Sequence, residues 1–188
     1  MLVRAKQELE KNLRTDPITG LGKDPLFAEY FAREWKRIVR DPSWISLIKF
    51  ELDYFEKYKQ CYSEIAANSC LQKVAKVVKE SAKRPAKLTI YSKKGQFSLL
   101  LPETNIVGAV YIADNLFNKI KDLKIINSQS SVDNHLTISV GITSIKPTQL
   151  NTEAGSSILI LSVENALQRA MEIGRNCKII QSCSDRFS

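Results

Sequence analysis

Four cysteines and one histidine are the residues of this sequence best suited to bind a soft metal or to form a nucleophilic site. The cysteines are Cys61, Cys70, Cys177 and Cys183, and His135 is the single histidine. The cysteine spacings match no zinc-binding pattern, and the shortage of histidine argues against Ser-His or Cys-His catalysis. We therefore predict free, partly buried thiols in a reducing cytoplasm, and neither a zinc centre nor a nucleophilic hydrolase.

The composition is that of one ordinary globular domain. The chain has 188 residues, of which 44% are hydrophobic and 26% are charged, and this balance excludes a disordered, collagen-like or disulfide-scaffold protein. No stretch approaches the roughly 18 apolar residues of a membrane span. The first six residues include Arg4 and Lys6 and do not lead into an apolar segment, so we expect no secretory signal.

The sequence is basic, with a net charge of +8, but its cationic residues are spread along the chain. Nothing resembles a basic arm or a zinc finger, and aromatic residues do not alternate with basic ones as they do on RNA-binding sheets. We therefore expect a solvated basic surface and no nucleic-acid partner. An anion-binding or nucleic-acid-binding module is the alternative, and its mark would be an affinity that falls steeply with salt.

Hydrophobic periodicity predicts alternating groups of helices and strands. Helices are expected at residues 2–13, 24–40 (with Asp24 as the N-cap), 54–60, 63–82, 104–123 and 158–173 (with Gly174 as the C-cap). Strands are expected at residues 44–52, 88–92, 97–101, 135–143 and 177–181, with loops at 128–134 and 146–156. The tight turn at residues 93–96 requires antiparallel neighbours. The fold class is therefore α+β, with a mixed, largely antiparallel central sheet flanked by helices.

Five motifs in this order resemble one family, the GGDEF domain of bacterial diguanylate cyclases, over about residues 16–180. The motifs are Asp16-Pro-Ile-Thr-Gly-Leu21, Phe50-Glu-Leu-Asp-Tyr-Phe55, Phe97-Ser-Leu-Leu-Leu-Pro102, Thr137-Ile-Ser-Val-Gly141 and Gly174-Arg-Asn176. The resemblance implies a βααββαβ core related to nucleotide-cyclase palms. Active members of the family condense two GTP molecules into cyclic di-GMP with carboxylate-held metal ions, and two domains face each other as a dimer.

The resemblance places the family's metal ligands on Glu51, the Leu52 carbonyl and Asp53. Glu51 stands where the family has aspartate, so its carboxylate reaches one methylene further, and Asp53 matches the second aspartate. Mg²⁺ needs hard oxygen ligands at fixed positions, which these residues could supply in part. The alternative interpretation is that both are ordinary acids at the end of a strand.

The family's Gly-Gly-Asp/Glu-Glu-Phe loop falls on Lys93, Lys94, Gly95, Gln96 and Phe97. The resemblance implies that the third residue is the catalytic, metal-binding acid, and here it is a glycine. The fourth residue keeps the shape of glutamate without its charge. Lys93 and Lys94 replace the glycines that let the backbone approach a nucleotide. They could supply charge to a phosphate, but an exposed hairpin tip is the simpler interpretation.

The nucleotide contacts implied by the family differ as well. The guanine-reading pair falls on Lys59 and Asn68, and an asparagine cannot balance both guanine donors as an aspartate does. The phosphate-binding lysine falls on Met171, whereas Arg175 matches the family's arginine.

The family's product-inhibition site, Arg-x-x-Asp, falls on Arg84 and Lys87, so the acid that would bind guanine is replaced by a lysine. The arginine could still meet a phosphate. We expect this site to be lost.

We therefore predict a catalytically inactive GGDEF-like domain that acts as a regulatory or protein-interaction module in bacterial signalling, in the cytoplasm. The alternative is a domain that binds GTP or cyclic di-GMP, or a weak diguanylate cyclase. We expect no cofactor, or Mg²⁺ if a nucleotide is bound. We expect a connector helix at residues 1–15 that could form a homodimer, the GGDEF-like domain at 16–181 and a tail at 182–188. The expected partner is another protein or an attached sensor domain.

Overall fold

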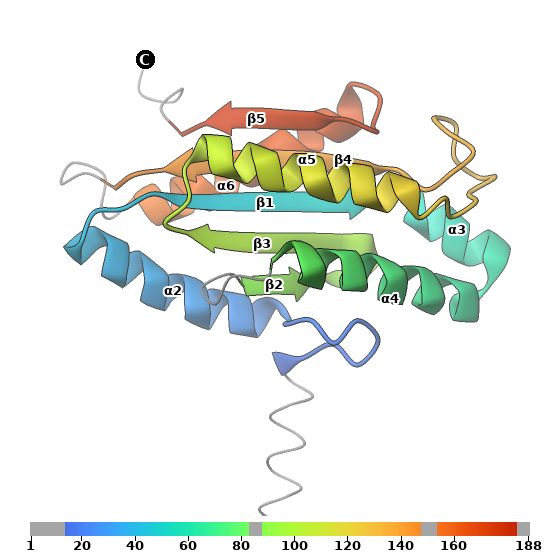
Figure 1. Ribbon diagram of the computed structural model, residues 1–188, viewed down its shortest axis with the longest axis horizontal. Coiled ribbons are helices and arrows are strands. Elements are labelled where there is room, and N and C mark those ends of the chain that lie inside the picture. The colour runs from blue at the N-terminus through green and yellow to red at the C-terminus, as the bar shows by residue number, and fades with distance from the viewer. Residues whose placement is uncertain (1–13, 83–87, 148–153, 184–188) are drawn as a thin grey trace, which may run out of the picture.

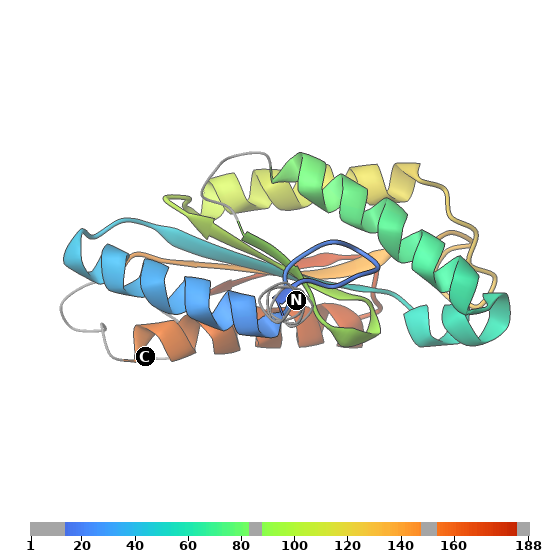
Figure 2. The same cartoon turned by 90° about the horizontal axis from the view of Figure 1, so that it is seen from below.

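The computed structural model describes residues 14–82, 88–147 and 154–183. Within these ranges one five-stranded sheet lies between two layers of helices, as Figures 1 and 2 show. The strands are β1 (Ile45–Leu52), β2 (Leu88–Tyr91), β3 (Gln96–Pro102), β4 (Ile138–Ile145) and β5 (Lys178–Ser182). The helices are α2 (Asp24–Arg40), α3 (Phe55–Tyr62), α4 (Glu64–Ser81), α5 (Ile106–Asp122) and α6 (Gly155–Glu172), with a short 3-10 turn, η1, at Lys93–Gly95.

The strand order is β2-β3-β1-β4-β5, and only the β4–β5 pair is parallel. The predicted α+β class, the mixed and largely antiparallel sheet and the βααββαβ core are confirmed. Two core clusters fill the two faces of the sheet. One lies under α4 and α5 and includes Phe50 and Phe97, and the other lies under α2 and α6 and includes Trp35 and Leu47. Figure 2 shows the sheet edge-on between these helix pairs.

Within the described ranges, every predicted boundary lies within three residues of the one in the structure, and the capping residues of α2 and α6 differ from the prediction. Asp24 is the first residue of α2 and not its N-cap, which is Lys23, and the Asp24 carboxylate instead accepts a hydrogen bond from Ser92 Oγ at 2.7 Å. Helix α6 begins at Gly155, inside the predicted loop, and its C-cap is Ile173, followed by Gly174 with a φ of +131°. Strand β4 covers residues 138–145, so it begins three residues later and ends two residues later than the predicted strand.

The opening turn of the domain closes on itself through Asp16. This buried carboxylate accepts hydrogen bonds from the backbone N–H and the hydroxyl of Thr19, both at 2.7 Å. Gly20 has a φ of +63°, in the left-handed region that favours glycine. After this turn Gly22 bridges to Ile90, so the chain covers the outer edge of β2. The first matching motif is therefore a structural element.

None of the four cysteines forms a disulfide, as predicted. Cys61 is exposed on α3, whereas Cys70 is buried in α4, where burial raises the pKa of its thiol to about 12. Burial also raises the pKa of Cys177, and the nearby Asp53 charge adds to this rise.

These environments predict selective alkylation. The thiolate is the nucleophile, and a thiol with a pKa near 12 is almost fully protonated at pH 8. Only about one Cys70 side chain in ten thousand is then a thiolate and able to react. We expect iodoacetamide to label Cys61 long before Cys70 in the folded protein, and peptide mass spectrometry would measure the two rates. In urea both should react alike. Equal rates in the folded protein would contradict the buried position of Cys70.

No helix in the described part of the chain is long and apolar enough to cross a lipid bilayer.

Candidate functional site

The end of β1 carries a fully buried acid, Asp53. Its Oδ1 accepts from Ser139 Oγ at 2.7 Å, and its Oδ2 accepts from Thr137 Oγ1 at 2.7 Å and from the Asn176 backbone N–H at 3.0 Å. Its own N–H donates to the Thr137 carbonyl at 2.9 Å. Both oxygens of the carboxylate are therefore engaged within the protein, so Asp53 joins β1, β4 and the turn before β5.

Arg175 is held against the same acid. Its Nη1 lies 3.5 Å from Asp53 Oδ1, and its guanidinium lies 4.7 Å from the centre of the Tyr54 ring. The Tyr54 hydroxyl in turn hydrogen-bonds Ser131 Oγ at 2.7 Å. Arg175 and Asn176 both have left-handed backbones, with φ of +64° and +48°, which form the sharp turn between α6 and β5. Arg175, which the resemblance placed among the nucleotide-binding residues, thus balances a buried charge.

Glu51 and Gln96 face each other across β1 and β3. They are register partners, and Gln96 Nε2 donates to Glu51 Oε2 at 2.7 Å. In the family both positions are acidic, and like charges directly opposite each other in a sheet destabilise it. Here the neutral amide of Gln96 donates to the Glu51 carboxylate, so Glu51 has a hydrogen-bond partner and needs no cation to balance a second acid.

The hairpin that would carry the catalytic acid has a compact tip. Lys93 and Lys94 are exposed, and Lys94 and Gly95 have positive φ values of +63° and +78°. A Cβ atom on Gly95 would lie 3.0 Å from Cγ and Cδ1 of Phe55. A side chain at this position would therefore require both an unfavourable backbone and a shift of Phe55.

Of the remaining predicted residues, three lie on helices α3, α4 and α6, one lies on β1 between Glu51 and Asp53, and two fall outside the described ranges. Lys59 is exposed on α3, with Nζ 4.0 Å from Glu64, and Asn68 is half-buried on α4. Met171 is in the last turn of α6 and is half-buried. Leu52 is buried and pairs with Ile138. Arg84 and Lys87, residues 1–13 of the predicted connector helix and residues 184–188 of the predicted tail lie outside the described residues, and Thr15 forms a β-bridge to Gly22.

These residues do not fit a magnesium site. Mg²⁺ requires several oxygen ligands in near-octahedral geometry. Asp53 is bonded to two hydroxyls and an N–H, Glu51 is bonded to an amide, and Gly95 has no side chain. Within the described ranges, no group of three or more His, Cys, Asp and Glu side chains could hold a metal ion.

Sequence reasoning did not assign roles to Thr137, Ser139 and Asn176. The alternation in Thr137-Ile-Ser-Val-Gly141 was a usable signal, because residues two apart on a strand share a face. That face meets α6 and Asp53, so the two hydroxyls and the glycine belong to one packing unit.

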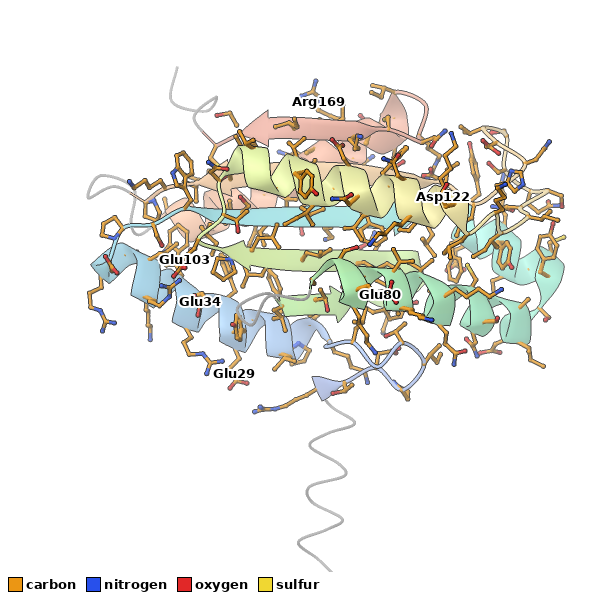
Figure 3. The ribbon with its side chains drawn as sticks, viewed as in Figure 1. Glu29, Glu34, Glu80, Glu103, Asp122 and Arg169 are labelled. Atoms are coloured by element: carbon orange, nitrogen blue, oxygen red, sulfur yellow. The ribbon has the colours of Figure 1, made fainter. Side chains whose placement is uncertain are left out.

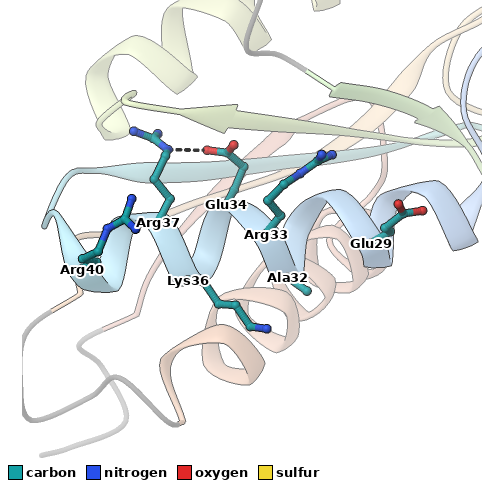
Figure 4. A pocket seen from close by; sticks show the side chains of 7 residues that line it. All are labelled: Glu29, Ala32, Arg33, Glu34, Lys36, Arg37 and Arg40. Carbon is teal, nitrogen blue, oxygen red and sulfur yellow. Dashed lines mark hydrogen bonds and ion pairs between the residues drawn. The ribbon is translucent and has the colours of Figure 1, made fainter.

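Positive charge gathers on the outer surface of α2, where a shallow hollow is lined by Arg33, Lys36, Arg37 and Arg40 among others (Figure 4). Arg37 is neutralised there: it donates to Glu34 and to Glu103, both at 2.9 Å, and these hydrogen bonds raise its pKa. Figure 3 shows Glu34 and Glu103 near each other at this end of the molecule. The positive charge of this hollow is thus partly balanced by Glu34 and Glu103.

The fold and the acid-bearing strand end define a domain of the nucleotide-cyclase palm class. The family model for "Diguanylate cyclase, GGDEF domain" matches residues 13–177, and the chain therefore belongs to the GGDEF domain family. This family acts in cyclic di-GMP signalling, and the resemblance seen in the sequence motifs is confirmed.

Known relatives agree with this assignment. Diguanylate cyclase A of Treponema denticola is 23% identical over 132 residues, which cover 70% of this chain and 34% of that protein. This chain thus spans about a third of that relative's length. The coiled coil and GGDEF domain of Caulobacter crescentus DgcB, solved with c-di-GMP, has a TM-score of 0.81 at 16% identity, covering 96% and 91% of the two chains.

A second similar structure contains a protein partner. Diguanylate cyclase SiaD of Pseudomonas aeruginosa, solved with its activator SiaC, has a TM-score of 0.75 at 19% identity. The match covers 95% of this chain and 66% of that one. At such identities these structures support the fold, and the function must be argued from the site.

A charge change at the Glu51–Gln96 pair should show whether the strand end tolerates the family's acids. Replacing Gln96 by glutamate would place two carboxylates opposite each other, and we expect a loss of about 1 kcal/mol in the free energy of unfolding. Thermal melts with and without 5 mM Mg²⁺ would measure the loss and any recovery. The variant Gln72→Glu, on the exposed face of α4 and with no acidic residue three or four positions away, is the control. An unchanged melting temperature would contradict the pairing.

Proposed function

We propose that this domain is a catalytically inactive member of the GGDEF family that acts in the bacterial cytoplasm as a regulatory or protein-interaction module. The observation that carries the proposal is the glycine at position 95, in the place of the catalytic acid, next to a Glu51 carboxylate that is bonded to Gln96. The motifs that support the fold match the family, whereas most of the residues that would perform its chemistry do not, Asp53 and Arg175 being the matches.

The expected cost to catalysis is large. Losing a metal-binding acid removes several kcal/mol of transition-state charge stabilisation, on the order of thousands-fold in rate. The changes at Lys59, Asn68 and Met171 add losses in guanine and phosphate binding. Because Gly95 has a φ of +78° and lies against Phe55, restoring an acid there would not restore the geometry.

A role in protein interaction has a precedent in the structural comparisons, since the similar SiaD was solved with its activator SiaC. By analogy we propose that a protein partner or an attached sensor domain acts on this chain, and that the predicted helix at residues 1–15 connects them. If the chain forms a homodimer, that helix is our proposed interface.

The alternative is a domain that binds GTP or cyclic di-GMP, or a weak diguanylate cyclase. The partly exposed Glu51 and the exposed Lys93 and Lys94 favour it, because Glu51 pairs with Gln96 of β3 and the two lysines directly precede this strand, which leaves one carboxylate and two cations at the same end of the sheet. Mg²⁺ would then accompany the nucleotide.

Isothermal titration with GTP and with cyclic di-GMP, each with Mg²⁺, separates these functions. We expect no binding of either at ligand concentrations up to 1 mM and no cyclic di-GMP from overnight incubation with GTP. The GGDEF domain of Caulobacter DgcB serves as the positive control for cyclic di-GMP binding. The variant Gly95→Glu should also remain inactive. Binding of GTP without turnover would establish the alternative, and turnover by the unaltered chain or by Gly95→Glu would overturn the proposal.

A further inference from the structure

A cavity of about 300 Å³ lies on the face of the sheet that α2 and α6 cover, away from the helices that carry Lys59 and Asn68. Its floor is the middle of β1 and β3, and its sides come from the first turns of α2, the end of β2 and the middle of α6. Figure 2 shows both helices on this side of the sheet. The volume is at the lower end of the range for small-molecule sites.

The walls of this cavity are mainly apolar. Phe27 and Ala28 line it from α2, Ile160 and Val163 line it from α6, and Leu47 and Ile90 come from the sheet. Such walls favour an aromatic or branched aliphatic group, because burying it removes apolar surface from water.

Three polar elements converge on the same space. Lys49, in the central strand, places Nζ 3.3 Å from Glu164 Oε1, and Asp24 accepts from Ser92 at 2.7 Å. The Ser98 hydroxyl is also part of the lining and makes no hydrogen bond within the described ranges. The polar groups stand on elements far apart in the sequence, so the fold brings them together.

Lys49 is a charged residue within the central strand. It stands between the fully buried Ile48 and Phe50, its side chain is 21% exposed, and its ammonium pairs with Glu164. Ionised side chains in a largely apolar cavity are costly and are common at binding sites. Two carboxylates against one ammonium give the cavity a net negative charge, and each carboxylate uses only one oxygen in these bonds.

We propose that this cavity is a binding site for a small primary amine with an aromatic or branched aliphatic body. The body lies between Phe27 and Val163, and the ammonium donates to Glu164 and Asp24. This site is separate from the nucleotide-binding region of the family and does not depend on the proposed function.

Phenethylamine is a suitable probe, and its charge-reversed counterpart is phenylacetate. Titration of the isotopically labelled chain, followed by NMR of backbone amides and methyl groups, should give saturable shifts at Ile90, Ile160 and Val163. For a ligand this small we expect a Kd of about 1 mM. We expect phenylacetate to bind at least tenfold more weakly.

Two pairs of variants locate the site. Ala28 and Ala32 are exposed alanines one turn apart on α2, but only Ala28 lines the cavity. Ala28→Phe should weaken phenethylamine binding at least tenfold, whereas Ala32→Phe should change it less than twofold. Glu164→Gln should weaken binding about tenfold, and Glu172→Gln, on the same helix, should not.

The titrations and the paired variants can either support or overturn the proposed amine site. The expected shifts, together with the contrast between the paired variants, would support the site. Absence of saturable shifts up to 10 mM phenethylamine, equal effects of Ala28→Phe and Ala32→Phe, or tighter binding of phenylacetate would overturn it.

Discussion

Replacing Asp53 by alanine is expected to lower the free energy of unfolding by about 3–5 kcal/mol, the usual cost of removing one partner of a buried ion pair. The Asp53 side chain is fully buried and accepts hydrogen bonds from Thr137, Ser139 and the Asn176 N–H. Its removal would leave these donors without their acceptor and the Arg175 guanidinium, 3.5 Å away, without its counter-charge. Urea denaturation followed by circular dichroism would measure the loss.

Two further variants test the cause of this loss. Asp53→Asn keeps the shape and one acceptor oxygen, so we expect a smaller loss than for alanine. Asp122→Ala removes an exposed acid at the end of α5 and should leave stability unchanged (Figure 3). If Asp53→Ala lowered stability only in the presence of Mg²⁺, the carboxylate would be a metal ligand, and its assignment as a structural residue would be wrong.

The elements of the fold could be predicted because each has a strong local pattern. Helix α2 repeats apolar residues at helical spacing, and Lys93–Gln96 is a turn between two apolar runs, so the boundaries were within a few residues. The start of α6 was missed by three residues because Gly155 and two serines are characteristic of a loop. In the structure Gly155 lies against the Trp35 ring, a contact between distant segments that overrides this local preference.

The roles within the candidate site depended on contacts that no local pattern contains. In the sequence Glu51 and Asp53 are two acids two residues apart at the end of a predicted strand, so nothing local predicts different environments for them. In the structure Asp53 is buried among partners 84, 86 and 123 residues away, whereas Glu51 faces a hairpin residue. The resemblance identified both as metal positions, but only the strand register shows that Gln96 donates to one of them. The cavity around Lys49 could not be predicted for the same reason, because its lining comes from α2, α6 and three strands that are far apart in the sequence.

Gly141 shows how a motif residue can serve packing alone. It stands on β4 under α6, and a Cβ atom there would lie 2.5 Å from the Val163 carbonyl oxygen and from the Leu167 backbone nitrogen. Both atoms belong to the helix backbone, so no side-chain rotation relieves the clash. The absence of a side chain at this position therefore sets the distance between α6 and the sheet, and with it the position of the turn that carries Arg175 and Asn176.

Gly141→Ala is accordingly expected to destabilise the domain by about 3 kcal/mol, near the upper end for overpacked sites. The sign is informative, because a glycine-to-alanine change in a roomy strand would be stabilising by about 0.5–1 kcal/mol. Gly108→Ala is the matched control: its Cβ would meet only the tip of the Thr104 side chain, and alanine suits the α5 helix better than glycine. Chemical denaturation of both variants measures the difference. If Gly141→Ala were as stable as the unaltered chain, α6 could not lie this close to β4, and the hydrogen bond from Asn176 to Asp53 would lose its structural basis.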